Sequence, residues 1–313
     1  MSIAVSVVVP LFNGAKTIQR ALDSVLEQGD GIEIIVIDDC STDGGPDMVD
    51  CRSDGATRLV RMEKNGGPAA ARNRGIAEAA GDWIGLLDAD DVWMPGRLKH
   101  FWPIMDRCDV VADGLIGYDS TAACFTGAFF DRIFPGPIGF EEVLGKKRGS
   151  VAFDSGYLKP LFRRSFVDRH KISYDTSIRQ GEDWLFYVEL ALLGARFELI
   201  DYLGYGYTTW VGGISGARSL TSHTRPNGAA LAEAVHRLAA RRQGEVDPVD
   251  RAALTDSAMA IQAEAGAWDF HDAVLRRNIG GIIASLLRHP SARHAAGEKI
   301  MTRFLSKKQG KPA

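Results

Sequence analysis

Hydrophobic runs alternate with amphipathic stretches along the N-terminal third of the chain. Val5–Val9 and Glu33–Ile37 are nearly continuous β-branched runs, typical of strands that are buried on both faces of a parallel sheet. Between them, Thr17–Glu27 has apolar residues three and four positions apart, a spacing that predicts a helix. Further strands are expected at Thr57–Met62 and Trp83–Leu87, each after a helical stretch. This order predicts an α/β fold with a Rossmann-like, doubly wound and mostly parallel sheet.

The pattern loosens after residue 108 and becomes helical toward the C-terminus. A helix is expected at Gly181–Leu193, and a loop rich in proline and glycine at Phe134–Gly139. Later strands are expected at Asp113–Tyr118, Ala123–Phe130, Arg196–Ile200 and Tyr205–Thr209. We therefore predict an α/β domain over residues 1–220, divided into 1–108 and 109–220, and a helical region over 221–313.

Composition narrows the class of protein without identifying it. The 313 residues are 45% hydrophobic and 25% charged, as in ordinary globular proteins, and the net charge of −3 gives no reason to expect a nucleic-acid partner. The four cysteines form no Cys-x-x-Cys pair, which disfavours zinc or redox motifs and indicates a cytoplasmic protein. No apolar run approaches the roughly 20 residues that a membrane-spanning helix needs.

Carboxylates follow two of the expected strands directly. Asp88-Ala89-Asp90-Asp91 comes after Trp83–Leu87, and Asp38-Asp39 after Glu33–Ile37. Ligands of doubly wound sheets bind at the carboxyl ends of the strands. Mg²⁺ and Mn²⁺ prefer carboxylate oxygens and often keep phosphate oxygens as further ligands. We therefore expect a divalent metal at Asp88–Asp91 that holds a diphosphate, with a solvated acidic turn as the alternative.

Four motifs together resemble those of family 2 glycosyltransferases, in that family's order and spacing over residues 3–95. They are Val7-Val8-Val9-Pro10-Leu11-Phe12-Asn13-Gly14, Ile37-Asp38-Asp39-Cys40-Ser41-Thr42-Asp43-Gly44, Asn65-Gly66-Gly67-Pro68-Ala69-Ala70-Ala71-Arg72-Asn73-Arg74-Gly75 and Leu87-Asp88-Ala89-Asp90-Asp91. The resemblance implies the GT-A fold and inverting transfer of a sugar from a nucleotide sugar, with UDP as the expected nucleotide. The implied acceptor is a saccharide or lipid-linked saccharide of a bacterial polysaccharide pathway.

The resemblance also implies roles for residues that hold the donor. Pro10, Leu11 and Phe12 would form the loop that approaches the base, and Asp39 would hold the base or ribose. The alternative interpretation of the segment that contains Asp39 is an Asx-turn that closes the loop. Arg72, together with Asn73, would brace the nucleotide loop.

The acidic motif has separate implied roles for its members. Asp88, with Ala89 after it, would touch the ribose or the metal, and Asp90 would be the principal metal ligand. Asp91 would be a further ligand or a helix cap.

A later acidic pair carries the expected catalytic residue. Gln180-Gly181-Glu182-Asp183-Trp184 resembles the family's Glu-Asp element at the start of a helix, and Asp183 would be the general base for the acceptor hydroxyl. The alternative is an acidic pair that interacts favourably with the helix dipole.

The same resemblance assigns the two halves of the predicted domain. Residues 1–108 would bind the nucleotide sugar and 109–220 the acceptor, with 221–313 as a C-terminal extension. In that extension Lys299–Lys308 is basic and amphipathic, which suits peripheral contact with the inner face of the cytoplasmic membrane. A terminal helix that docks on the protein body is the alternative.

Two rival functions remain open on the sequence. A sugar-phosphate nucleotidyltransferase would need a Gly-rich, Arg-bearing loop after the first strand, and Pro10–Gly14 is not such a loop. A non-catalytic carbohydrate- or nucleotide-binding scaffold on the same fold would be expected to lack Asp90 or Asp183, and both are present.

Overall fold

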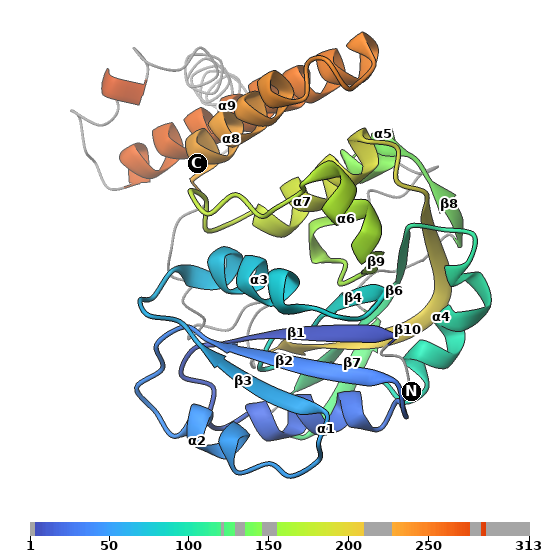
Figure 1. Ribbon diagram of the computed structural model, residues 1–313. Coiled ribbons are helices and arrows are strands. Elements are labelled where there is room, and N and C mark those ends of the chain that lie inside the picture. Colours follow the sequence, from blue (N-terminus) through green and yellow to red (C-terminus); the bar gives the residue numbers. More distant parts are fainter. Residues whose placement is uncertain are drawn as a thin grey trace, which may run out of the picture. The chain divides into compact units, whose positions relative to one another are not determined.

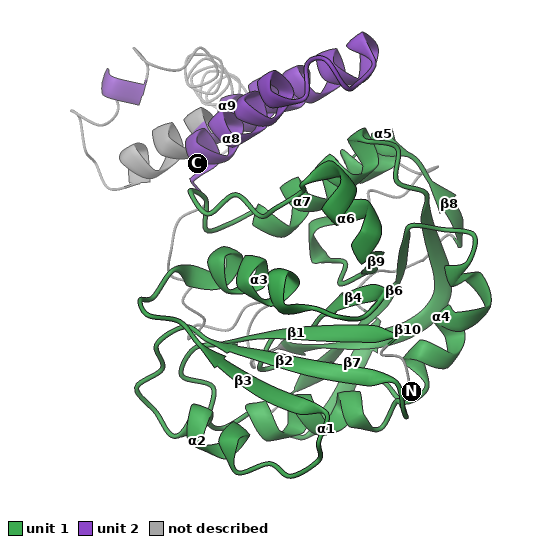
Figure 2. Ribbon diagram, in the orientation of Figure 1, with its two compact units in different colours: residues 1–225 green, residues 226–313 purple. Residues whose placement is uncertain are grey.

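The computed structural model describes residues 4–119, 122–128, 135–145, 155–209, 227–275 and 283–285. The chain divides into two compact units, Met1–Arg225 and Pro226–Ala313, coloured separately in Figure 2. Each unit is described by itself below.

The first unit is built on a mixed, mostly parallel sheet of ten strands (Figure 1). Their order is β3-β2-β1-β4-β9-β6-β10-β5, with β7 beside β6 and β8 beside β10. The strands are β1 (Val5–Leu11), β2 (Ile32–Asp38), β3 (Thr57–Arg61), β4 (Trp83–Leu86), β5 (Val92–Trp93), β6 (Val110–Asp119), β7 (Cys124–Ala128), β8 (Gly136–Ile138), β9 (Leu161–Arg163) and β10 (Phe197–Thr209). The doubly wound sheet expected from the sequence is confirmed for β1 to β4, which pair in parallel.

Helices cover both faces of this sheet. In Figure 1, α3 lies over one face of β1 and β2, while α1 and α2 lie over the other. The helices of the first unit are α1 (Ile18–Leu26), α2 (Gly45–Asp50), α3 (Gly67–Glu78), α4 (Arg97–Met105), α5 (Phe140–Val143), α6 (Arg164–His170) and α7 (Glu182–Leu192), with the 3₁₀ turn η1 (Ser155–Tyr157). Because both faces are covered, the central strands consist of apolar residues at nearly every position, and all of β2 is buried.

Strand β1 continues past the point where β4 stops pairing with it. The last bond between them runs from the Leu87 N–H to the Val8 carbonyl, at 3.1 Å. On the other edge, β1 stays paired with β2 through Leu11, whose carbonyl accepts from the Asp39 N–H at 2.8 Å. Pro10 therefore lies within the strand, whereas the sequence pattern had ended the strand before it. Beyond this point β1 and β4 diverge, and the loops that carry the motif residues begin.

The region after residue 108 departs from its predicted outline in two places. Arg196–Ile200 and Tyr205–Thr209 form one strand, β10, whose register with β6 shifts twice around Leu203. Residues 201–204, which the prediction left between two strands, form an irregular part of β10 that does not break the strand. The loop expected at Phe134–Gly139 is wrong in part, because β8 (Gly136–Ile138) pairs with β10.

The described part of the second unit consists mainly of two helices that pack against each other. α8 (Gly228–Arg241) and α9 (Pro248–Leu275) are joined by a short turn, and Ala232, Val235 and Leu254 are buried. The Asn227 side chain caps α8 by accepting from the Ala230 N–H at 3.0 Å. Within the parts of the chain that are described, no helix is long and apolar enough to cross a membrane. The basic segment Lys299–Lys308 lies outside the described residues.

Candidate active site at the carboxyl ends of β1, β2 and β4

The loops after β1 and β2 are bonded to each other. The Asn13 N–H donates to the Ser41 hydroxyl at 3.0 Å, and the Asn13 side-chain oxygen accepts from the Thr42 N–H at 2.8 Å. Asp43 accepts from the Ala15 N–H at 2.9 Å. Asn13 has a φ of +53°, a left-handed conformation that asparagine tolerates better than most residues. The two loops therefore form one rigid edge beside the acidic motif.

The three residues expected to approach the base differ in exposure. Leu11 is fully buried, Pro10 is half-buried within β1, and Phe12 is exposed. Ala89 lies close to this loop, because a Cβ placed on Gly14 would be 3.5 Å from the Ala89 Cβ. The loop after β1 and the acidic motif after β4 are thus neighbours.

Asp39 is buried and connects the end of β2 to the start of α3. Its two carboxylate oxygens accept from the Gly66 N–H at 2.7 Å and the Gly67 N–H at 2.8 Å. The Asn65 side chain donates to the Asp39 carbonyl at 2.9 Å. Gly67 has a φ of +81°, which a side chain would disfavour. Each oxygen of Asp39 keeps a further lone pair for an additional donor.

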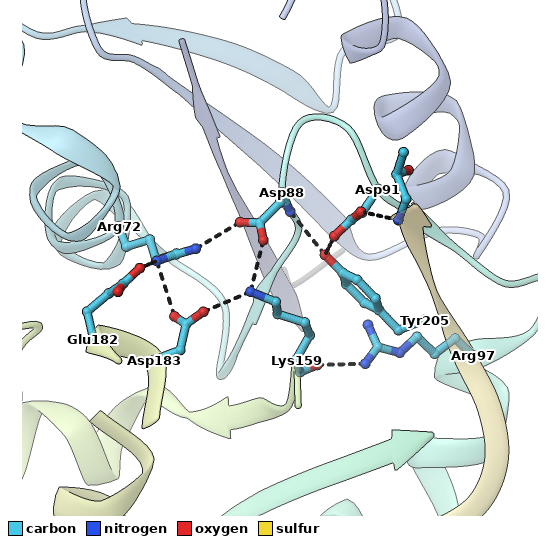
Figure 3. Close-up of polar contacts among 9 residues, drawn as sticks. Arg72, Asp88, Asp91, Arg97, Lys159, Glu182, Asp183 and Tyr205 are labelled. Atoms are coloured by element: carbon cyan, nitrogen blue, oxygen red, sulfur yellow. Dashed lines mark hydrogen bonds and ion pairs between the residues drawn. The ribbon is translucent and has the colours of Figure 1, made fainter. Parts of the chain in front are cut away.

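Asp88 and α7 are joined by two buried cations, as Figure 3 shows. Arg72, on α3, lies 2.9 Å from Asp88, 3.0 Å from Glu182 and 3.2 Å from Asp183. Lys159, in the coil before β9, lies 2.9 Å from Asp88 and 2.8 Å from Asp183. We call these five residues the site cluster. Its members are contributed by four segments that are distant in the sequence.

The acidic pair of the site cluster begins α7. Gly181 precedes the helix in the left-handed conformation, with a φ of +79°, and Glu182 and Asp183 occupy the first turn. Carboxylates are favourable there because of the helix dipole. Both side chains nevertheless turn toward Arg72, so the dipole alone does not account for their position.

The charges of the site cluster perturb one another. Burial would raise the pKa of Asp88, but the charges of Lys159 and Arg72 outweigh it and hold that pKa well below its usual range. Burial and the neighbouring charge of Asp183 raise the pKa of Glu182. Ionisable groups with perturbed pKa values that gather in one place indicate a candidate functional site.

Asp90 and Asp91 have different surroundings although they are adjacent. Asp91 is almost fully buried, and its oxygens accept from the Tyr205 hydroxyl and the Thr208 N–H, both at 2.7 Å. Asp90 has no ion pair with any described residue, and burial followed by the charge of Asp88 raises its pKa. The Asp90 carbonyl accepts from Arg20 at 2.6 Å, which fixes its backbone. Asp91 is followed by β5, so it does not cap a helix.

A divalent cation would find suitable donors at this turn. Asp90 is a half-buried carboxylate beside a second carboxylate, and a cation would relieve both effects that raise its pKa. No group of three or more histidine, cysteine or acidic side chains is arranged to hold a metal within the described parts of the chain. Asp90 is thus the better placed of the two donors, since both oxygens of Asp88 also contact Arg72 or Lys159. A bound phosphate would help to complete such a site, as is common for Mg²⁺.

Sequence reasoning missed Lys159 and Tyr205. The Tyr205 hydroxyl accepts from the Asp88 N–H at 3.2 Å and donates to Asp91, so it holds the backbone of the acidic turn. Lys159 stands in the segment Tyr157-Leu158-Lys159-Pro160, which has no periodic pattern of apolar residues and matches no motif. The only sequence signal for Tyr205 was its place in a predicted strand. Both act through partners that are far away along the chain.

Comparison with solved structures identifies the fold class. The chain is similar to S. aureus TarS 1–349 in complex with UDP-GlcNAc, over 90% of this chain and 79% of that chain, with a TM-score of 0.64 and 20% identity. At this identity the likeness concerns the fold alone. The architecture is that of the GT-A glycosyltransferases, as the sequence motifs predicted.

The chain belongs to glycosyl transferase family 2, whose family model matches residues 6–169. The succinoglycan biosynthesis protein ExoU of Rhizobium meliloti (strain 1021) is 38% identical over 220 residues, which is 68% of this chain and 64% of ExoU. ExoO of the same strain is 34% identical, over 67% of this chain and 62% of ExoO. The matched region therefore spans slightly less than two thirds of these two relatives.

Proposed function

We propose that this chain is an inverting, metal-dependent glycosyltransferase that moves a sugar from a nucleoside-diphosphate sugar to a hydroxyl of a saccharide or lipid-linked saccharide. UDP is the proposed nucleotide, which the UDP-GlcNAc complex of the structurally similar TarS supports. The names of ExoU and ExoO, as succinoglycan biosynthesis proteins, support an acceptor in bacterial polysaccharide synthesis.

The site cluster is the observation on which the proposal depends most. In it, the Lys159 ammonium contacts both Asp88, at the proposed donor side, and Asp183, at the proposed acceptor side. Asp88 and Asp183 are 95 positions apart in the sequence. A transferase needs its donor-binding groups and its base within reach of the same anomeric carbon, and this juxtaposition supports a single site for both.

In the proposed reaction, the acceptor hydroxyl oxygen attacks the anomeric carbon while the bond from that carbon to the diphosphate oxygen breaks. Asp183 takes the proton from the attacking hydroxyl, and the diphosphate leaves with the bonding electron pair. One base on the face opposite the leaving group is sufficient for inversion. Arg72 holds Asp88 and Asp183 in place from α3.

Asp90 and Asp88 are the residues proposed to hold the metal. When bound there, Mg²⁺ or Mn²⁺ would neutralise the negative charge that develops on the leaving diphosphate. We propose that Asp91 instead holds β10 against the acidic turn, because it is almost fully buried and bonded to Tyr205 and Thr208, whereas the Asp88 side chain is 27% exposed. Asp39 and the loop of Pro10, Leu11 and Phe12 are proposed to hold the nucleoside.

The proposal is tested with a panel of UDP-, GDP- and dTDP-sugars in the presence of Mn²⁺, with nucleotide release followed by mass spectrometry. We expect slow hydrolysis of one or more donors and its loss on addition of EDTA. The Asp90→Ala variant should bind UDP at least about tenfold more weakly in Mn²⁺, equivalent to ~1.4 kcal/mol. Asp30→Ala, at an exposed position before β2, is the matched control and should bind as the wild type does.

Absence of both turnover and a metal-dependent thermal shift would contradict the proposal. It would favour a binding scaffold on the same fold. Release of pyrophosphate from a nucleoside triphosphate and a sugar phosphate would favour a nucleotidyltransferase.

A further inference from the structure

Lys159 is the only lysine among the buried polar residues of the described chain. Burying an ammonium group is costly unless it is closely paired. The residue lies in the coil between η1 and β9, so no regular element dictates where its side chain points. Its burial therefore requires a specific support.

The backbone of Lys159 is held from α4 by a separate ion pair. The Lys159 carbonyl accepts from Arg97 Nη2 at 2.6 Å. Arg97 in turn donates to both oxygens of Asp113, at 2.9 and 2.7 Å, and both of these side chains are fully buried. We call Arg97 and Asp113 the clamp. The clamp fixes the backbone from which the Lys159 side chain extends into the site cluster, and Figure 3 shows its bond from Arg97 to the Lys159 carbonyl.

The Lys159 ammonium contacts one oxygen of each of two carboxylates. It lies 2.9 Å from Asp88 Oδ2 and 2.8 Å from Asp183 Oδ2. Asp88 follows β4, while Asp183 lies on α7. Without the cation, these like charges would repel each other with only Arg72 between them. The ammonium thus sets how far apart the two carboxylates lie.

We propose that Lys159 is a positioning residue that fixes the Asp183 carboxylate relative to Asp88, and so places the general base against the donor. This inference rests on the proposed glycosyl transfer. Lys159 acts through Asp183 and does not itself contact the reacting atoms.

The test compares Lys159→Met with Lys99→Met, which makes the same chemical change at an exposed position of α4. UDP affinity is measured by calorimetry in Mn²⁺, and kcat by UDP release from the UDP-sugar that the wild type hydrolyses. For Lys159→Met we expect UDP affinity within about threefold of wild type and kcat lower by about 100-fold. Lys99→Met should match the wild type in both measurements. Parallel losses of affinity and kcat in Lys159→Met, or no loss of either, would overturn the inference.

Two further variants separate positioning from general support of the fold. Lys159→Arg keeps the charge but changes its geometry, and we expect it to fold and to have a kcat between those of wild type and Lys159→Met. Combining Lys159→Met with Asp183→Asn should lower kcat no further than Asp183→Asn alone, because both remove the same function. Multiplied losses in the double variant would overturn the inference. A wild type without turnover would instead overturn the proposed function.

Discussion

Two groups of buried charges meet at Lys159, and they differ in how fully their charges are matched. The clamp pairs one cation with one carboxylate, and neither side chain is more than 1% exposed. The site cluster has two cations against three carboxylates, and the Asp88 side chain is 27% exposed. The clamp is therefore closed to ligands, whereas the site cluster has surplus negative charge and one accessible carboxylate.

The two groups also differ in how many aromatic rings surround their arginine. The Arg97 guanidinium lies 4.8 to 5.3 Å from the ring centres of Trp93, Phe101 and Tyr205, which are aromatic neighbours suited to a cation. In the site cluster, the Arg72 guanidinium lies 5.5 Å from one ring centre, that of Tyr174. Buried atoms without a hydrogen bond to a described residue occur in both groups: Arg97 Nη1 in the clamp, and Arg72 Nε and Asp183 Oδ1 in the site cluster. The comparison shows that a closed ion pair, the clamp, can hold the backbone of Lys159, while the adjacent site cluster keeps a partly exposed carboxylate for a ligand.

The largest expected effect tests the functional side of this comparison. Asp183→Asn should lower kcat by about 10²- to 10⁴-fold, because the base is lost, while metal-dependent UDP binding is retained. Steady-state UDP release and calorimetry measure the two quantities. Glu182→Gln, one residue away, is the control and should lower kcat by less than about tenfold. If Asp183→Asn turns over normally, Asp183 is not the base.

The next effect tests whether the clamp is structural. Asp113→Asn should lower the free energy of unfolding by about 3–5 kcal/mol, because it leaves Arg97 buried without its counter-charge. Denaturant unfolding measures this loss. Replacing both residues, as Arg97→Met with Asp113→Leu, should cost less than the single change, since no unpaired charge remains. A single variant as stable as the wild type would show that the clamp is not the closed pair described here.

A smaller effect tests how tightly the clamp is packed against β10. A Cβ added at Gly204 would lie 1.9 Å from Asp113 Oδ2 and 2.8 Å from Arg97 Cγ. Gly204→Ala should therefore destabilise the protein by about 1–3 kcal/mol through displacement of the buried pair. The denaturant midpoint measures it, and an unchanged midpoint would mean that the clamp can shift freely.

The smallest effect concerns an ion pair outside both groups. Arg196 donates to both oxygens of Asp109, at 2.8 and 3.0 Å, but the arginine side chain is 59% exposed. Solvent screening makes such pairs weak, so Arg196→Ala should leave the denaturant midpoint and kcat unchanged within error. A clear loss of stability would show that burial is not what separates the clamp from surface pairs.

The early strands and the acidic motif could be predicted because their signals are local. The β-branched run of β2 and the carboxylates after it stand side by side in the sequence, and topology alone brings Asp39 and Asp88 to one edge of the sheet. The position of Asp183 at a helix start was equally visible, because Gly181 and the apolar spacing of α7 mark it.

The rest of the site could not be predicted because it depends on long-range partners. Arg97 stands in the polar sequence Arg97-Leu98-Lys99-His100 and resembles a surface residue until α4 packs on β10. The role of Lys159 depends on its contacts with Asp88 and Asp183, which lie 71 residues before it and 24 residues after it. The helix α4 itself was not predicted, and the Pro103 within it is unfavourable in a helix interior.

The proline in β1 has a consequence for where the acidic turn begins. In a parallel ladder, the bond after the one from Leu87 N–H to the Val8 carbonyl would run from the N–H of residue 10 to the Leu87 carbonyl. An imino acid has no hydrogen to donate there. Position 10 therefore ends the ladder one bond earlier, and the chain can leave the sheet at Asp88. The length of one strand is thereby set by its neighbour, whichever side chains follow in the turn.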